Sequence, residues 1–423
     1  MAARLRRRAV AGRWPDRADE RWQSAVAGLR GRLGRVALGV VLAAEDASQA
    51  VLVAAVGLLG RHRVAVLPFL GHGTPDRVHI RARVVLGAGG LPAPGERTPS
   101  RPPTGARPVA SHTHSGTATV STGERRSAWR VLRASLGRFL TVELPGAPVT
   151  IRTPGGETRL RADREGYVDA VVEATGLGPG WQEVTLAAAW RSHRAEAVAR
   201  VLVVAADARI AVISDVDDTV IETGLTRGLE FLRLTLLTEV AERTPLAGAA
   251  ELYTALTRRP DGPPDPVFYL STSPWNLHDL LTDFVTLRGF PAGPMLLTDW
   301  GPGHGAFLRV PAERHKLTLI RQVLADHPGL GVVLIGDTGQ VDPEIYATVA
   351  DEAPDRVRAI YIRRTGGLPP RRSAEVSELA AGVTAAGVPM LAVDDSIQIA
   401  EHATRIGLLQ ESAVSAVRAA RSG

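Results

Sequence analysis

The chain contains no cysteine, one lysine and one asparagine among its 423 residues. Without cysteine it has no disulfide framework, no thiolate nucleophile and no cysteine-ligated zinc. Aromatic residues make up only 4% of the composition, and no apolar run reaches the roughly 18 uncharged residues of a membrane span. The chemistry of this protein therefore cannot depend on a thiolate or on zinc held by cysteine.

The N-terminal end carries charge without an apolar stretch. Residues 1–20 are rich in arginine and lack the apolar segment of a secretory signal, so we expect a cytoplasmic protein. Residues 36–59 come nearest to a membrane span, but Glu45 and Asp46 interrupt them, and the pattern of residues 21–60 predicts a helix. This helix either packs against its own domain, which we favour, or makes a peripheral contact at the inner membrane face.

The positive charge comes from arginine and does not by itself indicate a nucleic-acid-binding protein. The sequence pI is about 10.3, but the formal net charge is only +6 over the whole chain. The sequence is rich in alanine, arginine, glycine and valine, so compositional bias explains the pI better than a nucleic-acid partner does. We expect no nucleic-acid binding.

Between residues 61 and 206 the chain has the pattern of a β-rich accessory domain. Short stretches with strand-like patterns are separated by Pro-Gly turns, which predicts a small antiparallel sandwich. A low-complexity stretch at about 87–127 interrupts it and is expected to be a disordered insert. His112 and His114 lie in this insert, and without a third ligand nearby we favour a solvated loop over a metal site.

From residue 208 onwards the sequence alternates between predicted strands and helices. Such alternation predicts parallel strands joined by crossover helices, so we expect an α/β domain at 208–412, followed by a C-terminal tail at 413–423. The region before residue 61 is taken as an arginine-rich N-terminus and helical segment. The predicted strands of the α/β domain are 210–213, 266–270, 294–297, 331–335, 359–362 and 389–393.

The first predicted strand of this domain ends in a cluster of acidic residues. Asp215, Asp217 and Asp218 follow the apolar residues 210–213, and Thr219 comes directly after them. Buried carboxylates are costly unless they face a cleft, a metal or each other. Because ligands of open α/β sheets bind beyond the carboxyl ends of the strands, we expect Asp215 and Asp217 to reach an active site.

Two further clusters carry groups that bind phosphate. Ser271 and Thr272 end the second strand, and we expect a helix to follow with Ser273 as its cap and Pro274 at its first position. Hydroxyls and backbone N–H groups at such a point bind anions. Lys316, the only lysine, opens the next predicted helix, and arginine does not replace a compact ammonium between phosphate and carboxylate.

A fourth cluster follows the strand predicted at 331–335. Gly336, Asp337 and Asp342 lie there around a tight loop. Carboxylates from two separate strand ends favour a hard cation bound through oxygen, above all Mg²⁺. Together with the hydroxyls and the lysine they predict phosphoryl transfer, because a metal and an ammonium offset the charge on phosphoryl oxygens.

These four clusters resemble, in the same order, the motifs of the haloacid dehalogenase superfamily. More narrowly, the strings D-V-D-D-T, S-T-S-P-W-N-L and I-G-D-T-G-Q-V-D-P-E-I-Y are similar to those of the App1-type phosphatidate phosphatase family, over about residues 208–412. The resemblance implies a Rossmann-like parallel sheet with a minimal cap. The motif residues are Asp215, Asp217 and Thr219 for D-x-D-x-T, Ser271 and Lys316 for the strand-end hydroxyl and the lysine, and Gly336, Asp337 and Asp342 for G-D-x-x-x-x-D.

The resemblance also implies a role for each motif residue. Asp215 would be the nucleophile that forms an aspartyl-phosphate, with one oxygen on Mg²⁺. Asp217 would protonate the leaving oxygen, then activate the hydrolytic water, and its backbone carbonyl would reach the metal. Asp337 would bind the metal directly, and Asp342 indirectly or through water. The phosphoryl oxygens would be held by Ser271, Thr272 and Lys316, and the loop secured by Thr219.

The other polar residues near these motifs have simpler interpretations. The single asparagine, Asn276, is expected to contact substrate or fix the loop, with helix capping as the alternative. Asp395 has the position of a helix start. We assign no chemistry to Asp218, His304, His315, Asp394 and Asp395, and leave Glu222 and Arg227 open between substrate contact and a solvated loop.

The spacing of the motifs leaves little room for a cap domain, since only a short flap and one helix separate Thr219 from Ser271. We therefore expect an open site that suits a large or surface-presented substrate, and the resemblance implies phosphatidate or a related phospholipid monoester. A phosphatase of soluble or macromolecular phosphomonoesters and a non-catalytic membrane- or protein-binding module remain alternatives. The oligomeric state stays open.

Overall fold

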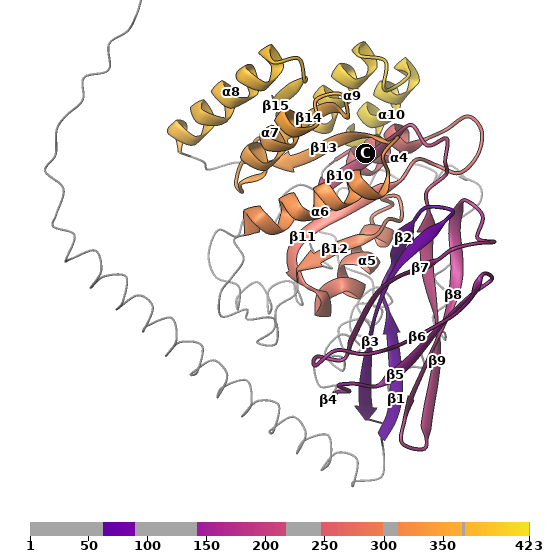
Figure 1. Ribbon diagram of the computed structural model, residues 1–423. Coiled ribbons are helices and arrows are strands. Elements are labelled where there is room, and N and C mark those ends of the chain that lie inside the picture. Colours follow the sequence, from indigo (N-terminus) through magenta and orange to yellow (C-terminus); the bar gives the residue numbers. More distant parts are fainter. Residues whose placement is uncertain (1–61, 89–141, 217–246, 299–311, 366–368, 423) are drawn as a thin grey trace, which may run out of the picture.

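The computed structural model describes residues 62–88, 142–216, 247–298, 312–365 and 369–422 (Figure 1). No helix within these ranges is long and apolar enough to cross a membrane. Several predictions fall outside them, namely the N-terminal helix at 21–60, the insert from residue 89 to 127, and the residues His112, His114, Asp217, Asp218, Thr219, Glu222, Arg227 and His304.

A fully parallel sheet of six strands organises the C-terminal part of the chain. Its strand order is β12-β11-β10-β13-β14-β15. The predicted α/β class and the predicted strands are confirmed, with small differences at the ends. The strands are β10 (Ile210–Asp215), β11 (Val267–Pro274), β12 (Met295–Thr298), β13 (Gly331–Asp337), β14 (Val357–Arg363) and β15 (Met390–Val393).

Helices cover both faces of this sheet. Alternate residues of a strand point to opposite faces, so each strand contributes side chains to two apolar clusters. Val212 belongs to an apolar cluster that includes residues of α4, α5, α9 and α10. Its neighbour Ile213 belongs to a second cluster with residues of α6, α7 and α8. The helices are α4 (Ala249–Thr257), α5 (His278–Leu287), α6 (Ala312–Asp326), α7 (Asp342–Glu352), α8 (Pro370–Ala385), α9 (Ser396–Arg405) and α10 (Glu411–Ser422).

The strand order reverses next to β10. From β10 the chain builds β11 and β12 on one side, and it then crosses to build β13, β14 and β15 on the other. A crevice for ligands forms where neighbouring connections leave the sheet in opposite directions. The carboxyl ends of β10, β11 and β13 meet at this point, and they carry three of the four motif clusters.

The described residues 62–88 and 142–203 form a second sheet, drawn in indigo to magenta in Figure 1. Its nine strands are mostly antiparallel, with one parallel pair between β2 and β9, and they enclose one apolar cluster. The strands are β1 (His62–Pro68), β2 (Gly71–Gly73), β3 (Arg77–Ala88), β4 (Val142–Glu143), β5 (Pro148–Thr153), β6 (Gly156–Arg161), β7 (Tyr167–Glu173), β8 (Gly180–Trp190) and β9 (His193–Val203).

The sequence pattern did not mark every strand of this region. β2, β6 and β9 were not predicted. The glycines of β2 favoured a turn at Gly71–Gly73, and charged residues crowd β6 and β9 and obscure their apolar alternation. β6 is almost entirely exposed, and it is held by its antiparallel pairing with β5. The low-complexity insert was predicted from about residue 87, but β3 continues to Ala88.

Three local predictions in the C-terminal part were wrong. Pro274 does not open a helix: it is the last residue of β11, and the helical turn Trp275–Leu277 separates it from α5. Lys316 lies one turn inside α6 rather than at its start. The predicted tail at 413–423 is most of α10, because Val414 and Val417 share one helix face and are buried in the core.

The two regions share part of one apolar core. Phe69 and Tyr167 from the β-rich region belong to the same buried cluster as Trp275, Leu277 and other residues of the α/β region. The β-rich region is therefore packed against the α/β region through buried side chains.

Candidate active site

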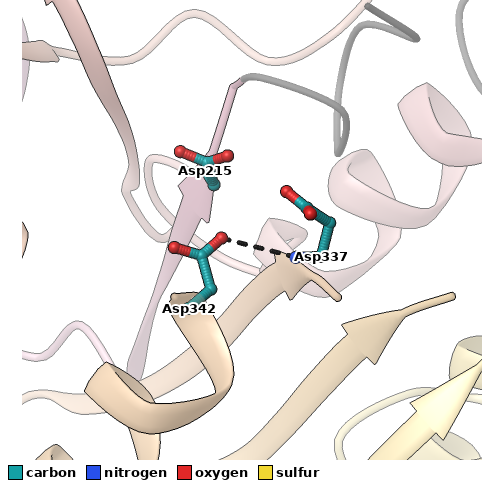
Figure 2. Close-up of side chains that lie close together, drawn as sticks. All are labelled: Asp215, Asp337 and Asp342. Carbon is teal, nitrogen blue, oxygen red and sulfur yellow. Dashed lines mark hydrogen bonds between the residues drawn. The ribbon is translucent and has the colours of Figure 1, made fainter. Parts of the chain in front are cut away.

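Three buried carboxylates lie together at the carboxyl ends of the central strands. Asp215 ends β10, Asp337 ends β13, and Asp342 is the first residue of α7 (Figure 2). Each has a relative exposure of 0%. One oxygen from each carboxylate lies within 4.8 Å of the others. Asp215 thus forms a single acidic cluster with two carboxylates that lie more than 120 positions later in the sequence.

Lys316 supplies a buried positive charge next to this acidic cluster. Its Nζ lies 2.6 Å from Asp215 Oδ1 and 2.7 Å from Asp342 Oδ1, and its side chain is fully buried. Burial by itself would lower the pKa of Lys316, but the charges of Asp215 and Asp342 outweigh this effect and raise the pKa above its ordinary value. The ammonium is therefore charged, and α6 carries it to the centre of the cluster.

The balance of charge tests whether these residues fit a metal ion. Three carboxylates and one ammonium leave a formal charge of −3 + 1 = −2 in a buried place. Such an excess is unfavourable in a protein interior unless a cation offsets it. The donors are all oxygen, which suits a hard divalent cation such as Mg²⁺. The acidic cluster therefore fits a metal of this kind.

The loop between β13 and α7 orients Asp337 and Asp342. Asp337 Oδ1 accepts hydrogen bonds from the backbone N–H groups of Gly339, at 2.5 Å, and Gln340, at 3.0 Å. Asp342 Oδ2 accepts a longer one from the N–H of Asp337, at 3.4 Å (Figure 2). Gly336 makes this close approach possible, since a Cβ at that position would lie 2.6 Å from Asp342 Oδ2. The absence of a side chain at Gly336 thus lets the end of β13 lie close to the first residue of α7.

Gln340 is a site residue to which the sequence reasoning assigned no role. Its Oε1 accepts a hydrogen bond from Lys316 Nζ at 3.1 Å, and its Nε2 donates one to Asp215 Oδ2 at 3.1 Å. One neutral side chain therefore bridges the lysine and the first aspartate. The available signal was its position within the motif loop, three residues after Asp337.

The hydroxyl cluster lies beside Asp215. Leu270 is the pairing partner of Asp215 in the sheet, and Ser271 follows it directly. Ser271 is buried, and its Oγ accepts a hydrogen bond from the N–H of Ser273 at 3.0 Å. Thr272 is half-buried between them. Asn276 lies in the turn Trp275–Leu277, and its side chain is outside what the structure describes.

A buried tyrosine is linked to the backbone of Asp215 through the hydroxyl of Ser214. The Ser214 hydroxyl donates to the carbonyl oxygen of Asp215 at 2.8 Å. Because the single proton of Ser214 is used in this bond, the Tyr253 hydroxyl must donate to Ser214 Oγ, which lies 2.6 Å away. Burial raises the pKa of Tyr253 above its usual range, with smaller contributions from nearby groups, so the phenol stays protonated. Sequence patterns gave no sign of this pair.

His315, Asp394 and Asp395 are not members of the acidic cluster and have other partners. His315 is half-buried, and its Nε2 lies 3.3 Å from the carbonyl oxygen of Leu297. Asp394 is exposed and pairs with Arg364. Asp395 caps α9, where its Oδ1 accepts from the N–H of Gln398 at 3.0 Å, as its helix-start position predicted.

Comparisons with known proteins match the part of the chain that holds this site. Residues 210–364 match the family described as "Phosphatidate phosphatase APP1, catalytic domain". Phosphatidate phosphatase APP1 of Saccharomyces cerevisiae is 26% identical over 242 residues, which cover 55% of this chain and 40% of the yeast protein. An uncharacterized protein of Schizosaccharomyces pombe is 29% identical over 154 residues, covering 36% of this chain and 25% of that protein. This chain thus matches less than half the length of either relative.

Among solved structures, a carbohydrate acetylesterase from Xanthomonas citri covers 66% of this chain and 68% of its own, at 14% identity and a TM-score of 0.25. A likeness at that level carries no argument. The resemblance drawn from the four motifs, in contrast, is confirmed: residues 210–364 match the catalytic-domain family of phosphatidate phosphatase APP1.

Proposed function

We propose that this chain is a metal-dependent phosphatase that hydrolyses a phosphomonoester, with phosphatidate or a related phospholipid monoester as its substrate. One observation carries the proposal: Lys316 Nζ lies between Asp215 and Asp342 at the point where the strand order reverses. An ammonium, a nucleophilic carboxylate and an oxygen-rich metal site at one strand edge are what phosphoryl transfer requires.

The residues that would hold the metal are Asp215 and Asp337, with Asp342 beside them and the backbone carbonyl of Asp217 as a further ligand. When bound, Mg²⁺ offsets negative charge on the phosphoryl oxygens. Lys316, Ser271 and Thr272 would bind those oxygens from the protein side.

The reaction would run in two displacements. In the first, a carboxylate oxygen of Asp215 attacks phosphorus, the bond to the ester oxygen breaks, and Asp217 gives its proton to the leaving alcohol. In the second, Asp217 accepts a proton from water as that water attacks the phosphorus of the aspartyl-phosphate. The P–O bond to Asp215 then breaks, and inorganic phosphate leaves with Asp215 restored as a carboxylate and Asp217 restored as the protonated acid.

A lipid substrate is supported by the family match and by the name of the yeast relative, which is a phosphatidate phosphatase. The short spacing between the motifs also leaves the site without a large cap, so a headgroup at a membrane surface can enter. Peripheral contact of the enzyme with the cytoplasmic face of a membrane follows from this proposal.

The test uses the full chain with phosphatidate vesicles and measures released phosphate. We expect release that requires Mg²⁺, is lost on chelation, and falls about 10³-fold or more in Asp215→Asn. Asp207→Asn is the matched control, because Asp207 is exposed and pairs only with Arg259 among the described residues. Asp217→Asn should trap phosphorylated protein or abolish turnover.

Faster turnover of soluble sugar phosphates or nucleotides than of vesicles would overturn the lipid substrate and leave the phosphatase proposal standing. Vesicle binding without hydrolysis of any phosphomonoester would instead show a non-catalytic binding module.

A further inference from the structure

The turn that follows the phosphate-binding hydroxyls contacts the β-rich region. Trp275 and His278 come directly after Ser271–Pro274, and the Phe69 ring lies against both, with ring centroids 4.9 Å from Trp275 and 4.8 Å from His278. Trp275 and His278 are themselves stacked at 6.0 Å. We call this set of residues the domain contact. It consists of Phe69, Leu70 and Arg81 from the β-rich region and Trp275 and His278 from the α/β region.

An arginine of the β-rich region closes the domain contact over the tryptophan. The Arg81 guanidinium carbon lies 4.4 Å from the Trp275 ring centroid, which is within the range of a cation–π interaction. Arg81 lies on β3, and its carbonyl oxygen accepts a hydrogen bond from the N–H of Phe69 at 2.9 Å. The two residues that cover Trp275 are therefore fixed to each other through the backbone.

A hydrogen bond across the domain contact also fixes His278. The backbone N–H of Leu70 donates to His278 Nε2 at 3.1 Å. Because Nε2 accepts, the ring proton is on Nδ1, which donates to Asp279 Oδ1 at 2.8 Å. The ring orientation and tautomer of His278 thus depend on a residue 208 positions earlier in the chain.

The phosphate-binding hydroxyls need such an anchor because β11 is irregular where they lie. Its register against β12 shifts between Leu270 and Pro274, so regular pairing does not hold Ser271 and Thr272 in place. The ordered pairing of β10 with β11 stops at Leu270 on one side of these residues. On the other side, Pro274 pairs with Thr298 of β12, and the buried Trp275 and His278 of the domain contact come after it.

We propose that the β-rich region is a positioning part of the active site: through Phe69, Leu70 and Arg81 it holds Trp275 and His278, and thereby sets the geometry of the Ser271–Thr272 phosphate-binding turn. This inference rests on the proposed phosphatase function. It assigns to the described β-rich residues 62–88 and 142–203 a role in phosphate binding through residues that position the site rather than through contact with the substrate.

The test compares KM with kcat in the full chain, using p-nitrophenyl phosphate and phosphatidate vesicles. In Arg81→Met, which keeps the length of the side chain without its charge, we expect KM and the inhibition constant of inorganic phosphate to rise about fivefold. The value of kcat should stay within about twofold of the wild type, because the acidic cluster is untouched. Arg81→Lys should restore most of the affinity.

A second pair of variants keeps the test independent of Arg81. His278→Gln can place an amide oxygen near the position of Nε2 and still accept from Leu70, whereas His278→Asn is too short to do so. We expect weaker phosphate binding in the Asn variant and near wild-type binding in the Gln variant. Arg191→Met is the matched control, because Arg191 lies over Trp190 at the same 4.4 Å but in the turn between β8 and β9.

Two outcomes would overturn the proposal. The first is that KM and the inhibition constant of phosphate are unchanged in Arg81→Met and His278→Asn. The second is that these variants only lose kcat, in proportion to the fraction of protein that is no longer folded. Failure of the proposed function is a separate result. If the wild type releases no phosphate from any ester, binding of inorganic phosphate, measured by calorimetry in the presence of Mg²⁺, still tests the domain contact in the same variants.

Discussion

Among single residues, Lys316 explains how three carboxylates are tolerated in a protein interior. An ammonium has three N–H donors, and the structure offers three acceptors to them: Asp215 and Asp342 at 2.6 and 2.7 Å, and Gln340 Oε1 at 3.1 Å. A phosphoryl oxygen that binds Lys316 must replace one of these acceptors. Gln340 carries no charge and makes the longest of the three contacts. We therefore expect the phosphoryl oxygen to displace Gln340 Oε1 from Lys316.

We predict a split effect for Gln340→Ala. Loss of the hydrogen bond to Asp215 Oδ2 leaves the proposed nucleophile less well oriented, so kcat should fall about fivefold, the value of one ordinary hydrogen bond. KM should not rise, because phosphate no longer competes with the amide for Lys316. Gln322→Ala is the control, since Gln322 makes a comparable side-chain bond to Asp326 on the surface of α6. Steady-state kinetics decide, and a raised KM with unchanged kcat would contradict the prediction.

The charged residues of the site were predictable from the sequence, whereas Gln340 was not. Asp215, Asp337, Asp342 and Lys316 stand out because a buried charge needs a partner, and their strand-end and helix-start positions are visible in the sequence. A glutamine carries no such signal. Its role depends on hydrogen bonds to residues 24 and 125 positions away, which only the folded chain brings together.

At the level of elements, the connection from β13 to α7 depends on the absence of a side chain at Gly336. A Cβ there would lie 2.6 Å from Asp342 Oδ2 and 2.8 Å from a ring carbon of Tyr346. Tyr346 cannot move away easily, because it is fully buried and its hydroxyl donates to the carbonyl oxygen of Ile335 at 3.1 Å. The first turn of α7 is therefore packed directly on the end of β13.

Gly336→Ala should destabilise the fold by about 2 kcal/mol or more and reduce kcat, because Asp342 and the α7 turn must shift. Gly382→Ala is the matched control: Gly382 lies inside α8, nothing lies within 4 Å of the added Cβ, and we expect stabilisation by up to about 1 kcal/mol. Chemical denaturation and kinetics measure both effects. Equal stability changes of the two variants would show that the β13–α7 connection is less tightly packed than the structure indicates.

At the level of the whole molecule, a second group of contacts joins the two regions around His72. This histidine of β2 is buried, and its ring lies 5.2 Å from Phe268 on β11, 6.1 Å from His327 and 5.6 Å from His79. Burial, with the nearby His79 and His327, lowers the pKa of His72 to about 3, against a smaller opposing effect of Asp169. His72 is therefore neutral in the folded protein at ordinary pH.

Because of this lowered pKa, we expect the folded protein to lose stability as the pH falls. The unfolded chain binds a proton at His72 near its ordinary pKa of 6.5, whereas the folded chain does not until about pH 3. Stability should therefore be complete above pH 6.5 and fall by about 3 kcal/mol from this group between pH 6.5 and pH 4. In His72→Phe, the free energy of unfolding measured by denaturation should fall less steeply as the pH is lowered across that range. His193→Gln, at an exposed position, should behave as the wild type; identical slopes in all three proteins would refute the prediction.

The sequence by itself predicted the parallel α/β sheet, the resemblance to the App1 family, and the carboxylates and lysine that the fold brings together. These follow from local patterns: apolar runs form strands, and acids at strand ends must meet a cation. Only the tertiary structure decided that Gln340 bridges Lys316 and Asp215, that α10 belongs to the core, and that Phe69 and Arg81 reach Trp275. Each of these depends on contacts between distant parts of the chain, and such contacts arise from packing that no local pattern records.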